Sequence, residues 1–230
     1  MIKTNICNCI DCEEGWANFK VLTEEELDLL ERSRYEANFR PGEMIVKQSS
    51  PASNAVFLRS GMAKIYMEGQ GQKNLIINIV KPGRMIVGTG IYTDLRHSYS
   101  ISSIDEVKAC FISVEVIRKL FRQNRDFADG IIKEISIMSN FYLHKLLSMT
   151  QKKMPGRVAE VLLYLADEVF CSDEFKPLLT RQELADMAGM AKESIVRILK
   201  DFSNEGIICS DCPEIKILKK ETLEMISENG

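Results

Sequence analysis

The segment between Thr180 and Phe202 limits the fold of this chain more than any other. Thr180 and Glu183 have the spacing of a capping box, which satisfies two backbone donors at the start of a helix. Gly189 stands where that helix would end, and glycine adopts the positive φ of a sharp turn at little cost. A second apolar-periodic run begins at Lys192. The sequence therefore predicts two helices joined by a short turn, the arrangement that places a second helix in the DNA major groove.

Apolar residues mark the buried sides of these two helices. They are Leu184, Met187 and Ala188, with Ala185 at a close helix crossing, and then Ile195, Ile198 and Leu199. The opposite face of the second helix carries Lys192, Glu193, Val196, Arg197 and Lys200. Arginine can bond guanine O6 and N7 together, and a carboxylate can accept from cytosine N4, so Arg197 and Glu193 suit base reading. The alternative is an ordinary ion pair on a solvated helix, but the capping box and the glycine turn favour base reading.

From Tyr35 to about Val116 the pattern is that of short strands. The runs are Met44-Ile45-Val46, Ala55-Val56-Phe57-Leu58, Ala63-Lys64-Ile65-Tyr66-Met67, Leu75-Ile76-Ile77-Asn78-Ile79-Val80 and Ala109-Cys110-Phe111-Ile112. The turns between them are Pro41-Gly42, Ser60-Gly61, Gly69-Gln70-Gly71 and Pro82-Gly83. Strands at such spacing predict an antiparallel sandwich or barrel. Ahead of them, Thr23 and Glu26 form an earlier capping box.

From Val114 to Thr150 the apolar period becomes helical. One stripe consists of Ile131, Ile135, Met138, Tyr142, Leu146 and Met149. This stripe packs either on its own domain or on a second copy, and its length favours a dimer seam. Pro155-Gly156 is expected to interrupt the helices as a hinge between domains. A further amphipathic helix follows, with Val158, Val161, Leu162, Leu165 and Val169 on its apolar face.

Composition agrees with two domains in one cytoplasmic chain. The 230 residues suit two compact domains, and 45% hydrophobic residues suffice for their cores. No apolar run reaches the length of a membrane span, and the first residues lack a secretory pattern. The net charge of −3 neither supports nor excludes DNA binding, because the local charge of the contact face decides. No triad order, metal-hydrolase motif or phosphate-binding glycine loop is present, so an enzyme is not expected.

The run from Leu179 to Leu199 resembles the helix-turn-helix of the Crp/Fnr regulators. The shared residues are Leu179-Thr180-Arg181-Gln182-Glu183-Leu184-Ala185, Gly189 and Glu193-Ser194-Ile195-Val196-Arg197-Ile198-Leu199. Turns of that family's jelly-roll sensor domain resemble Arg40-Pro41-Gly42-Glu43, Leu58-Arg59-Ser60-Gly61 and Lys81-Pro82-Gly83. One departure is Ala191, because a hydroxyl often caps the recognition helix in the family.

The resemblance implies an α+β protein with a jelly-roll β-barrel sensor domain, a long dimerisation helix and a C-terminal winged helix-turn-helix. We expect a cysteine-containing segment over 1–19, the sensor over 20–117, the dimer helix over 118–152 and the DNA-binding domain over 153–230. The expected partners are duplex DNA, a second copy and, by resemblance, RNA polymerase. The expected DNA-binding residues are Thr180, Arg181, Gln182, Lys192, Glu193, Ser194 and Arg197.

The cysteines suggest what the sensor detects. In the family's cyclic-AMP branch a Gly-Glu-Leu pattern precedes an Arg with Ser or Thr, whereas this chain has Val87-Gly88-Thr89 and Arg96-His97-Ser98, so cyclic AMP is not expected. The total of seven cysteines is odd, which argues against a closed disulfide framework. Cys7, Cys9, Cys12 and, at a distance, Cys110 resemble the ligands of the family's iron–sulfur branch, although with different spacing. An iron–sulfur cluster, a four-thiolate zinc site and plain reduced thiols all remain open.

The other chemistry-bearing residues carry weaker signals. Cys209 and Cys212 make a single C-x-x-C pair in the expected wing, which is half a zinc site, and Cys171 is no evident complement. His97 would suit a haem ligand in a haem-sensing relative, and His144 is expected to be solvated. The function predicted is therefore a dimeric regulator that reads an inverted-repeat operator under a redox or small-ligand signal. The alternative is a redox or metal-binding protein whose helix-turn-helix contacts proteins.

Overall fold

The computed structural model describes residues 16–209 and 214–230, so Cys7, Cys9, Cys12 and Cys212 lie outside the described residues. The chain divides into two compact units, of which the first comprises residues 1–67 and 80–139 and the second residues 68–79 and 140–230. Each unit is described by itself. Within the described ranges, no helix is long and apolar enough to cross a membrane.

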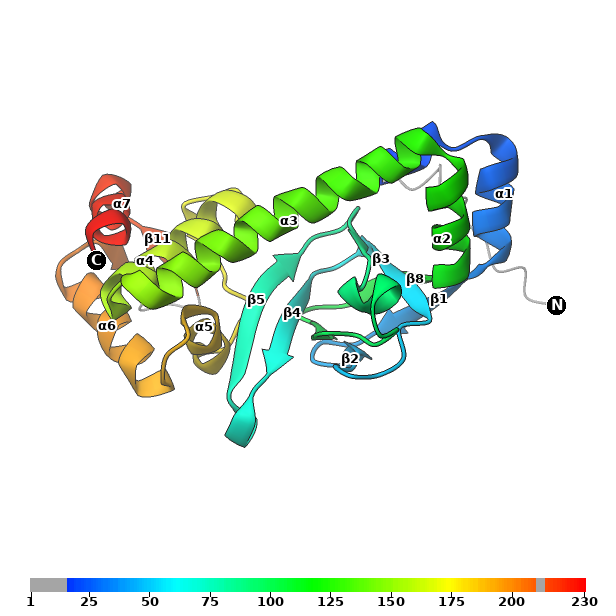
Figure 1. Ribbon diagram of the computed structural model, residues 1–230. Coiled ribbons are helices and arrows are strands. Elements are labelled where there is room, and N and C mark those ends of the chain that lie inside the picture. The colour runs from blue at the N-terminus through cyan, green and yellow to red at the C-terminus, as the bar shows by residue number, and fades with distance from the viewer. Residues whose placement is uncertain (1–15, 210–213) are drawn as a thin grey trace. The chain divides into compact units, whose positions relative to one another are not determined.

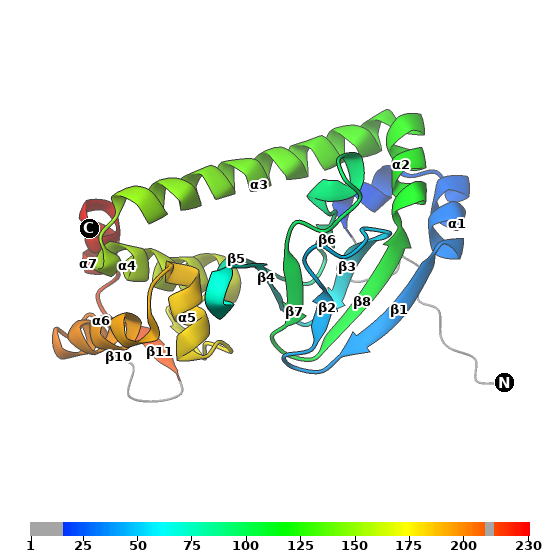
Figure 2. The same ribbon diagram turned by 60° about the horizontal axis from the view of Figure 1, so that its bottom comes forward.

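The strands before Val114 are antiparallel, as the alternating pattern predicts. Their bounds are β1 (Arg34–Phe39), β2 (Met44–Val46), β3 (Asn54–Ser60), β4 (Ala63–Glu68), β5 (Asn74–Val80), β6 (Met85–Ile86), β7 (Ser100–Ser103) and β8 (Val107–Ser113). They belong to the first unit except for Glu68 of β4 and residues 74–79 of β5, which belong to the second. One sheet has the strand order β1-β8-β3-β6 and the other the order β2-β7-β4-β5 (Figure 2). All five runs expected to be strands are strands, and the β-roll fold is confirmed. The turn at Gly69–Gly71 joins β4 to β5 through η2 (Gln70–Gln72), a single 3₁₀ turn.

Helices close one side of this β-roll. They are η1 (Ala17–Val21), α1 (Glu24–Arg32), η3 (Thr89–Tyr92) and α2 (Val114–Gln123). Thr23 and Glu26 form the expected capping box at the start of α1. The main core cluster joins Trp16, Phe19, Leu30, Phe57, Ile112, Leu120 and Phe127. The ring of Trp16 meets Phe19 and Phe127 edge-on, at centroid distances of 5.4 and 5.8 Å. The contact with Phe127 joins the start of η1 to α3, which follows the sheet.

The helical region after Val114 is not one helix, because Asn124 separates α2 from α3 (Arg125–Gln151). Asn124 has extended backbone angles and so ends α2. Its Oδ1 accepts a hydrogen bond from the backbone N–H of Phe127 at 3.0 Å, which is how an N-cap satisfies the first turn of a helix. Its Nδ2 donates to Glu26 at 2.8 Å, so the same side chain also holds α1.

The stripe assigned to α3 combines two faces of the helix, which corrects the sequence interpretation. Ile131 is 4% exposed and packs in the core of the first unit, and Tyr142 and Met149 are half-buried. Ile135 and Leu146 are instead 55% and 61% exposed. At about 100° per residue the buried and the exposed positions lie on neighbouring faces of the helix. A spacing of three or four residues alone therefore does not distinguish the two faces.

The second unit is helical with one small sheet (Figure 1). Its elements after α3 are α4 (Met154–Tyr164), the π-helical turn η4 (Leu165–Phe170), β9 (Glu174–Phe175), α5 (Arg181–Ala188), α6 (Lys192–Asn204), β10 (Ile208–Cys209), β11 (Ile215–Ile217) and α7 (Lys220–Asn229). The strand order of the sheet is β10-β11-β9. Two of its strands, β10 and β11, follow α6 as the wing of a winged helix-turn-helix does.

Pro155 begins a helix rather than interrupting one, contrary to the expected hinge at Pro155-Gly156. α3 ends at Gln151, and Lys153 is the N-cap of α4. Proline is favoured in the first turn because the N–H that it lacks would have no partner inside the helix. Gly156 is buried within α4, where an added Cβ would lie 3.0 Å from the Cα of Gly230. The break is therefore at Lys152-Lys153.

Candidate nucleic-acid interface and sensor residues

Both ends of α5 are held as the sequence predicts. The Thr180 side chain accepts from the backbone N–H of Glu183 at 3.2 Å, and the Glu183 carboxylate accepts from the backbone N–H of Thr180 at 2.6 Å. At the other end Gly189 has φ 60° and ψ 47°, the left-handed conformation that costs residues with a Cβ about 1–2 kcal/mol. The turn contains only Gly189, Met190 and Ala191 before α6 begins. These constraints set the start and direction of α6.

α6 separates apolar and polar faces cleanly. Ile195, Ile198, Leu199 and Phe202 are buried, and Lys192, Glu193, Val196, Arg197 and Lys200 are exposed, as expected. Among the ion pairs of residues 16–209 and 214–230, none joins Glu193 to Arg197. The alternative of a simple ion pair on this helix therefore finds no support. Both side chains are free to meet a ligand on the exposed face.

The remaining expected DNA contacts lie around the start of α5 and α6. Gln182 is exposed and donates to Asp186 at 2.8 Å, whereas Arg181 and Ser194 are half-buried. The Thr180 hydroxyl donates to Glu183 at 2.8 Å in addition to its capping role.

The first turn of α6 has no side-chain cap. Its N-cap is Ala191, with extended angles of φ −72° and ψ 149°. Its carbonyl accepts from the N–H groups of Ser194 and Ile195 at 3.0 and 3.3 Å, so the backbone has the N-cap geometry without the oxygen that would complete it.

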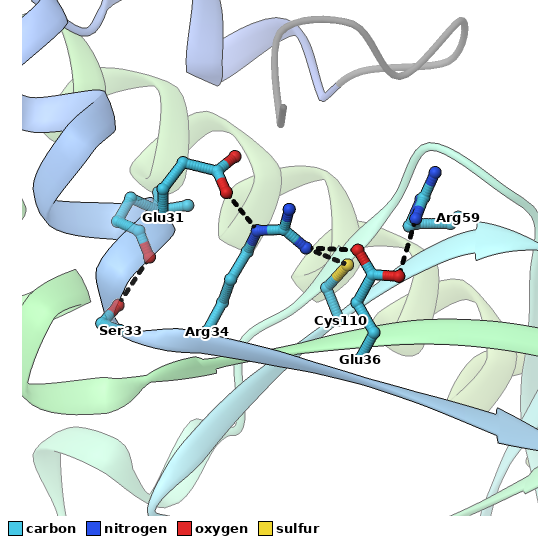
Figure 3. A network of polar contacts seen from close by, with 7 residues as sticks. Glu31, Ser33, Arg34, Glu36, Arg59 and Cys110 are labelled. Atoms are coloured by element: carbon cyan, nitrogen blue, oxygen red, sulfur yellow. Dashed lines mark hydrogen bonds and ion pairs between the residues drawn. The ribbon is translucent and has the colours of Figure 1, made fainter. Parts of the chain in front are cut away.

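Cys110 lies at the buried end of a charged network in the first unit (Figure 3). Its sulfur accepts a hydrogen bond from Arg34 Nη1 at 3.4 Å. The Arg34 side chain is only 4% exposed and donates through Nε to Glu31 at 2.7 Å and through Nη1 to Glu36 at 2.5 Å. Arg59 pairs with the other oxygen of Glu36 at 2.9 Å. The expected ligand is thus beside a guanidinium that is itself paired with two carboxylates.

Opposing effects set the charge state of Glu36. Burial alone would raise the pKa of its carboxyl, but the hydrogen bond from Arg34 and the positive charges of Arg59 and Arg34 outweigh it. The pKa of Glu36 is therefore below its ordinary value, and the carboxylate stays ionised near neutral pH. Nothing in the sequence around Cys110 pointed to these residues, because the pairing of β8 with β1 on one side and with β3 on the other brings them together.

Arg96 and His97 lie in the loop where the family resemblance would place a cyclic-nucleotide pocket, and this loop is held by contacts with its own unit. Arg96 is exposed, and its guanidinium donates to the carbonyl of Ser49 at 2.6 Å. His97 is buried, its Nδ1 has no partner among the described residues, and burial lowers its pKa. A Cβ on Gly88 would lie 3.2 Å from that nitrogen. His97 is thus packed on the chain that precedes η3.

Among the described residues, Cys171, Cys209 and His144 do not assemble into a site. Cys171 and Cys209 are exposed, and the partner of Cys209 in the C-x-x-C pair, Cys212, lies outside the described residues. No three possible metal ligands come together within the ranges that the structure describes. His144 is exposed as expected, but it also lines a cavity that the sequence did not reveal.

Two family models match this chain. Residues 36–124 match the cyclic nucleotide-binding domain, and residues 156–226 match the Crp-like helix-turn-helix domain. The first match covers the β-roll and α2, and the second covers α4 to α7.

Several known proteins align over most of the chain. Electron transport regulator A of Shewanella oneidensis is 25% identical, over 97% of this chain and 91% of that protein. A CRP-like cAMP-activated global transcriptional regulator of Mycobacterium tuberculosis is 23% identical, over 81% and 85%. A Crp/Fnr-family crystal structure from Eubacterium rectale has a TM-score of 0.78 at 17% identity, covering 93% of this chain and 98% of that one. FixK2 of Bradyrhizobium japonicum has a TM-score of 0.75 at 17% identity, covering 84% and 96%.

A cyclic-nucleotide-binding-like β-roll followed by a winged helix-turn-helix defines a class of transcription regulators. The chain belongs to the Crp/Fnr family of this class. Members of the family are transcription regulators rather than enzymes, and the helix-turn-helix implies DNA binding.

Replacing Ala191 by Ser should stabilise the protein, because the hydroxyl can accept from an unsatisfied N–H of the first turn of α6. The expected gain in the free energy of unfolding is about 1 kcal/mol. Denaturant unfolding of Ala191→Ser, with Ala191→Val as a β-branched control that cannot cap, measures it. A gain in both variants would show that capping is not the cause.

Proposed function

We propose that this protein is a dimeric transcription regulator that reads an inverted-repeat operator with α6. The observation that carries the proposal is the exposed face of α6, on which Glu193 and Arg197 are not paired with each other. Arg197 would bond guanine in the major groove and Glu193 would accept from cytosine N4. Lys192 and Ser194 would contact the DNA from the same helix, and Thr180, Arg181 and Gln182 would stand close to phosphates.

Pairing of two copies through α3 accounts for an apolar face that the chain leaves exposed. This face comprises Ile132, Ile135, Leu143, Leu146 and Leu147, which are between 51% and 63% exposed. At about 100° per residue they fall on one side of α3, together with Ser136, Ser139 and Thr150. A long helix with such a stripe is suited to a coiled-coil-like contact with an identical helix. The seam proposed here replaces the mixed stripe expected from the sequence.

The proposed signal is a redox change or a small ligand sensed in the first unit. Cyclic AMP is a poor candidate, because Arg96 is occupied by the Ser49 carbonyl and no carboxylate follows Gly88. By family resemblance the output would include a contact with RNA polymerase. Residues 20–117, 118–152 and 153–230 would serve as sensor, dimer helix and DNA-binding domain.

An iron–sulfur cluster on Cys7, Cys9, Cys12 and Cys110 is the redox candidate. The observation in its favour is the hydrogen bond from the Arg34 guanidinium to the Cys110 sulfur, because this donor would hold the sulfur in place as a cluster ligand. When bound, such a cluster would supply sensitivity to oxygen. Arg34 would hold the Cys110 side chain in place, and Glu31 and Glu36 would hold Arg34.

Removing the guanidinium of Arg197 should relax the choice of one base pair. Arg197→Ala is expected to lose about 1–3 kcal/mol of discrimination at one guanine. Competition binding to a family-like palindrome and its single-base variants measures this loss. Arg32→Ala, which changes an exposed arginine of α1, is the control. If neither the parent nor the variant prefers the palindrome over scrambled duplex, the result contradicts base reading by α6. It would then favour the alternative, in which the helix-turn-helix contacts proteins.

A charge in the α3 face should separate the two copies. Leu146→Glu is expected to sediment as a monomer where the parent sediments as a dimer, because pairing would bury two carboxylates against apolar side chains. Met225→Glu, at a residue of α7 with 56% exposure, is the matched control and should stay dimeric. A parent that sediments as a monomer, alone and with DNA whose half-sites lie about 34 Å apart, would contradict the seam.

Substitution of Cys110 should remove any cluster while keeping the fold. Protein purified without oxygen is expected to contain iron and to lose operator affinity in air, and Cys110→Ser should abolish both properties, since a hydroxyl is a poor iron ligand. Cys209→Ser should behave as the parent does. If the anaerobic protein contains no iron and binds DNA equally well in air, the cysteines are reduced thiols and the cluster proposal is wrong. If it contains zinc in place of iron, the four-thiolate zinc site is indicated.

A further inference from the structure

The second unit contains a cavity of about 140 Å³ among four of its elements. Apolar side chains form most of the wall: Ile77 of β5, Phe141 of α3, Val161 of α4 and Met187 of α5. An engineered apolar cavity of about 150 Å³ in another protein takes up benzene, so this volume matches one six-membered ring.

The phenol and the carboxylate of the wall are satisfied by neighbouring residues, whereas the amine is satisfied only in part. The hydroxyl of Tyr164 donates to Asn78 Oδ1 at 2.8 Å and accepts from the N–H of Ile79 at 3.2 Å. Burial raises the pKa of Tyr164 to about 12, so this phenol stays neutral. Glu160 accepts from the Ser148 hydroxyl and pairs with Lys152 at 3.0 Å. The negative charge of Glu160 is thus already balanced.

Lys145 carries the amine of the wall. Its Nζ donates to the backbone carbonyl of Met187 at 2.7 Å, which uses one of the three N–H donors of an ammonium group. Among the described residues it makes no ion pair with a carboxylate. Burial lowers the pKa of Lys145 to about 8, although the Glu160 charge acts in the opposite direction. A buried ammonium group with no carboxylate in direct contact is stabilised when an anion enters beside it.

We propose that this cavity binds a small organic anion, with a carboxylate on Lys145 and a single apolar ring against Ile77, Phe141, Val161 and Met187. The walls select an apolar body of ring size, and the two remaining N–H donors of Lys145 select an anionic oxygen. Because Met187 lies next to the last residue of α5, a ligand that engages Lys145 also acts on the helix that precedes the recognition helix. Ile77 is the one lining residue from a strand of the β-roll, and the others come from α3, α4 and α5. None of the lining residues belongs to the network around Cys110, so the site does not depend on the redox signal proposed for the sensor.

Binding should be accompanied by proton uptake. With a pKa of about 8, about half of the Lys145 amines are neutral at pH 8, and an incoming carboxylate favours the protonated form. The other titratable groups at the cavity are His144 of α3 and Glu160 and Tyr164 of α4, with Lys152 paired to Glu160. β5 and α5 contribute only Ile77 and Met187 to the lining.

Calorimetric titration of the full chain with benzoate tests the proposal, with benzyl alcohol as a neutral ligand of similar size. Benzoate is expected to bind about 10- to 100-fold more tightly than benzyl alcohol, as a charge-assisted hydrogen bond would give. Titrations at pH 8 in two buffers of different ionisation enthalpy should show uptake of about half a proton per benzoate bound.

Two variants and one control make the test decisive. Lys145→Met should abolish the preference for benzoate over benzyl alcohol. Ile77→Phe should fill the cavity and lower the affinity for both ligands. This second variant keeps the proposal testable if the first does not fold. Lys133→Met, at an exposed lysine of α3, should bind as the parent does. The proposal is overturned if millimolar benzoate gives no binding, or if folded Lys145→Met or Ile77→Phe binds it unchanged.

Discussion

The start and direction of α6 depend on how α5 is held at its two ends. The Thr180–Glu183 box satisfies the first backbone donors of α5, and the left-handed Gly189 ends the helix and turns the chain. With only three residues between the helices, little freedom is left in the turn. The buried residues of α6 then determine which side of that helix faces solvent. The exposure of Glu193 and Arg197 therefore depends on the position of α5 as well as on the sequence of α6.

Local signals in the sequence predicted most of this fold. Capping boxes, the glycine turn and the strand alternation each act over a few residues, and each is where it was expected. Asn124 was missed because an asparagine inside a helical pattern indicates a cap only once the chain around it is known to turn. Pro155 was misread for the related reason that proline breaks a helix interior but favours a helix start.

Contacts between distant segments were beyond the sequence pattern. The residues around Cys110 come from α1, β1 and β3, and only the antiparallel register of β1 with β8 sets Arg34 beside that sulfur. The cavity at Lys145 likewise needs β5, α3, α4 and α5 together. The two faces of α3 show the same limit. The spacing of apolar residues indicates which side chains avoid water, but it does not indicate whether the same chain or a second copy covers them.

The exposed apolar face of α3 has a thermodynamic consequence. If an identical helix covers it, the folded state is stabilised by mass action, and the free energy of unfolding rises with protein concentration. Dilution would then lower the melting temperature without any change in sequence or solvent. A cell that makes more of this regulator would obtain a protein that is more stable per molecule as well as more abundant.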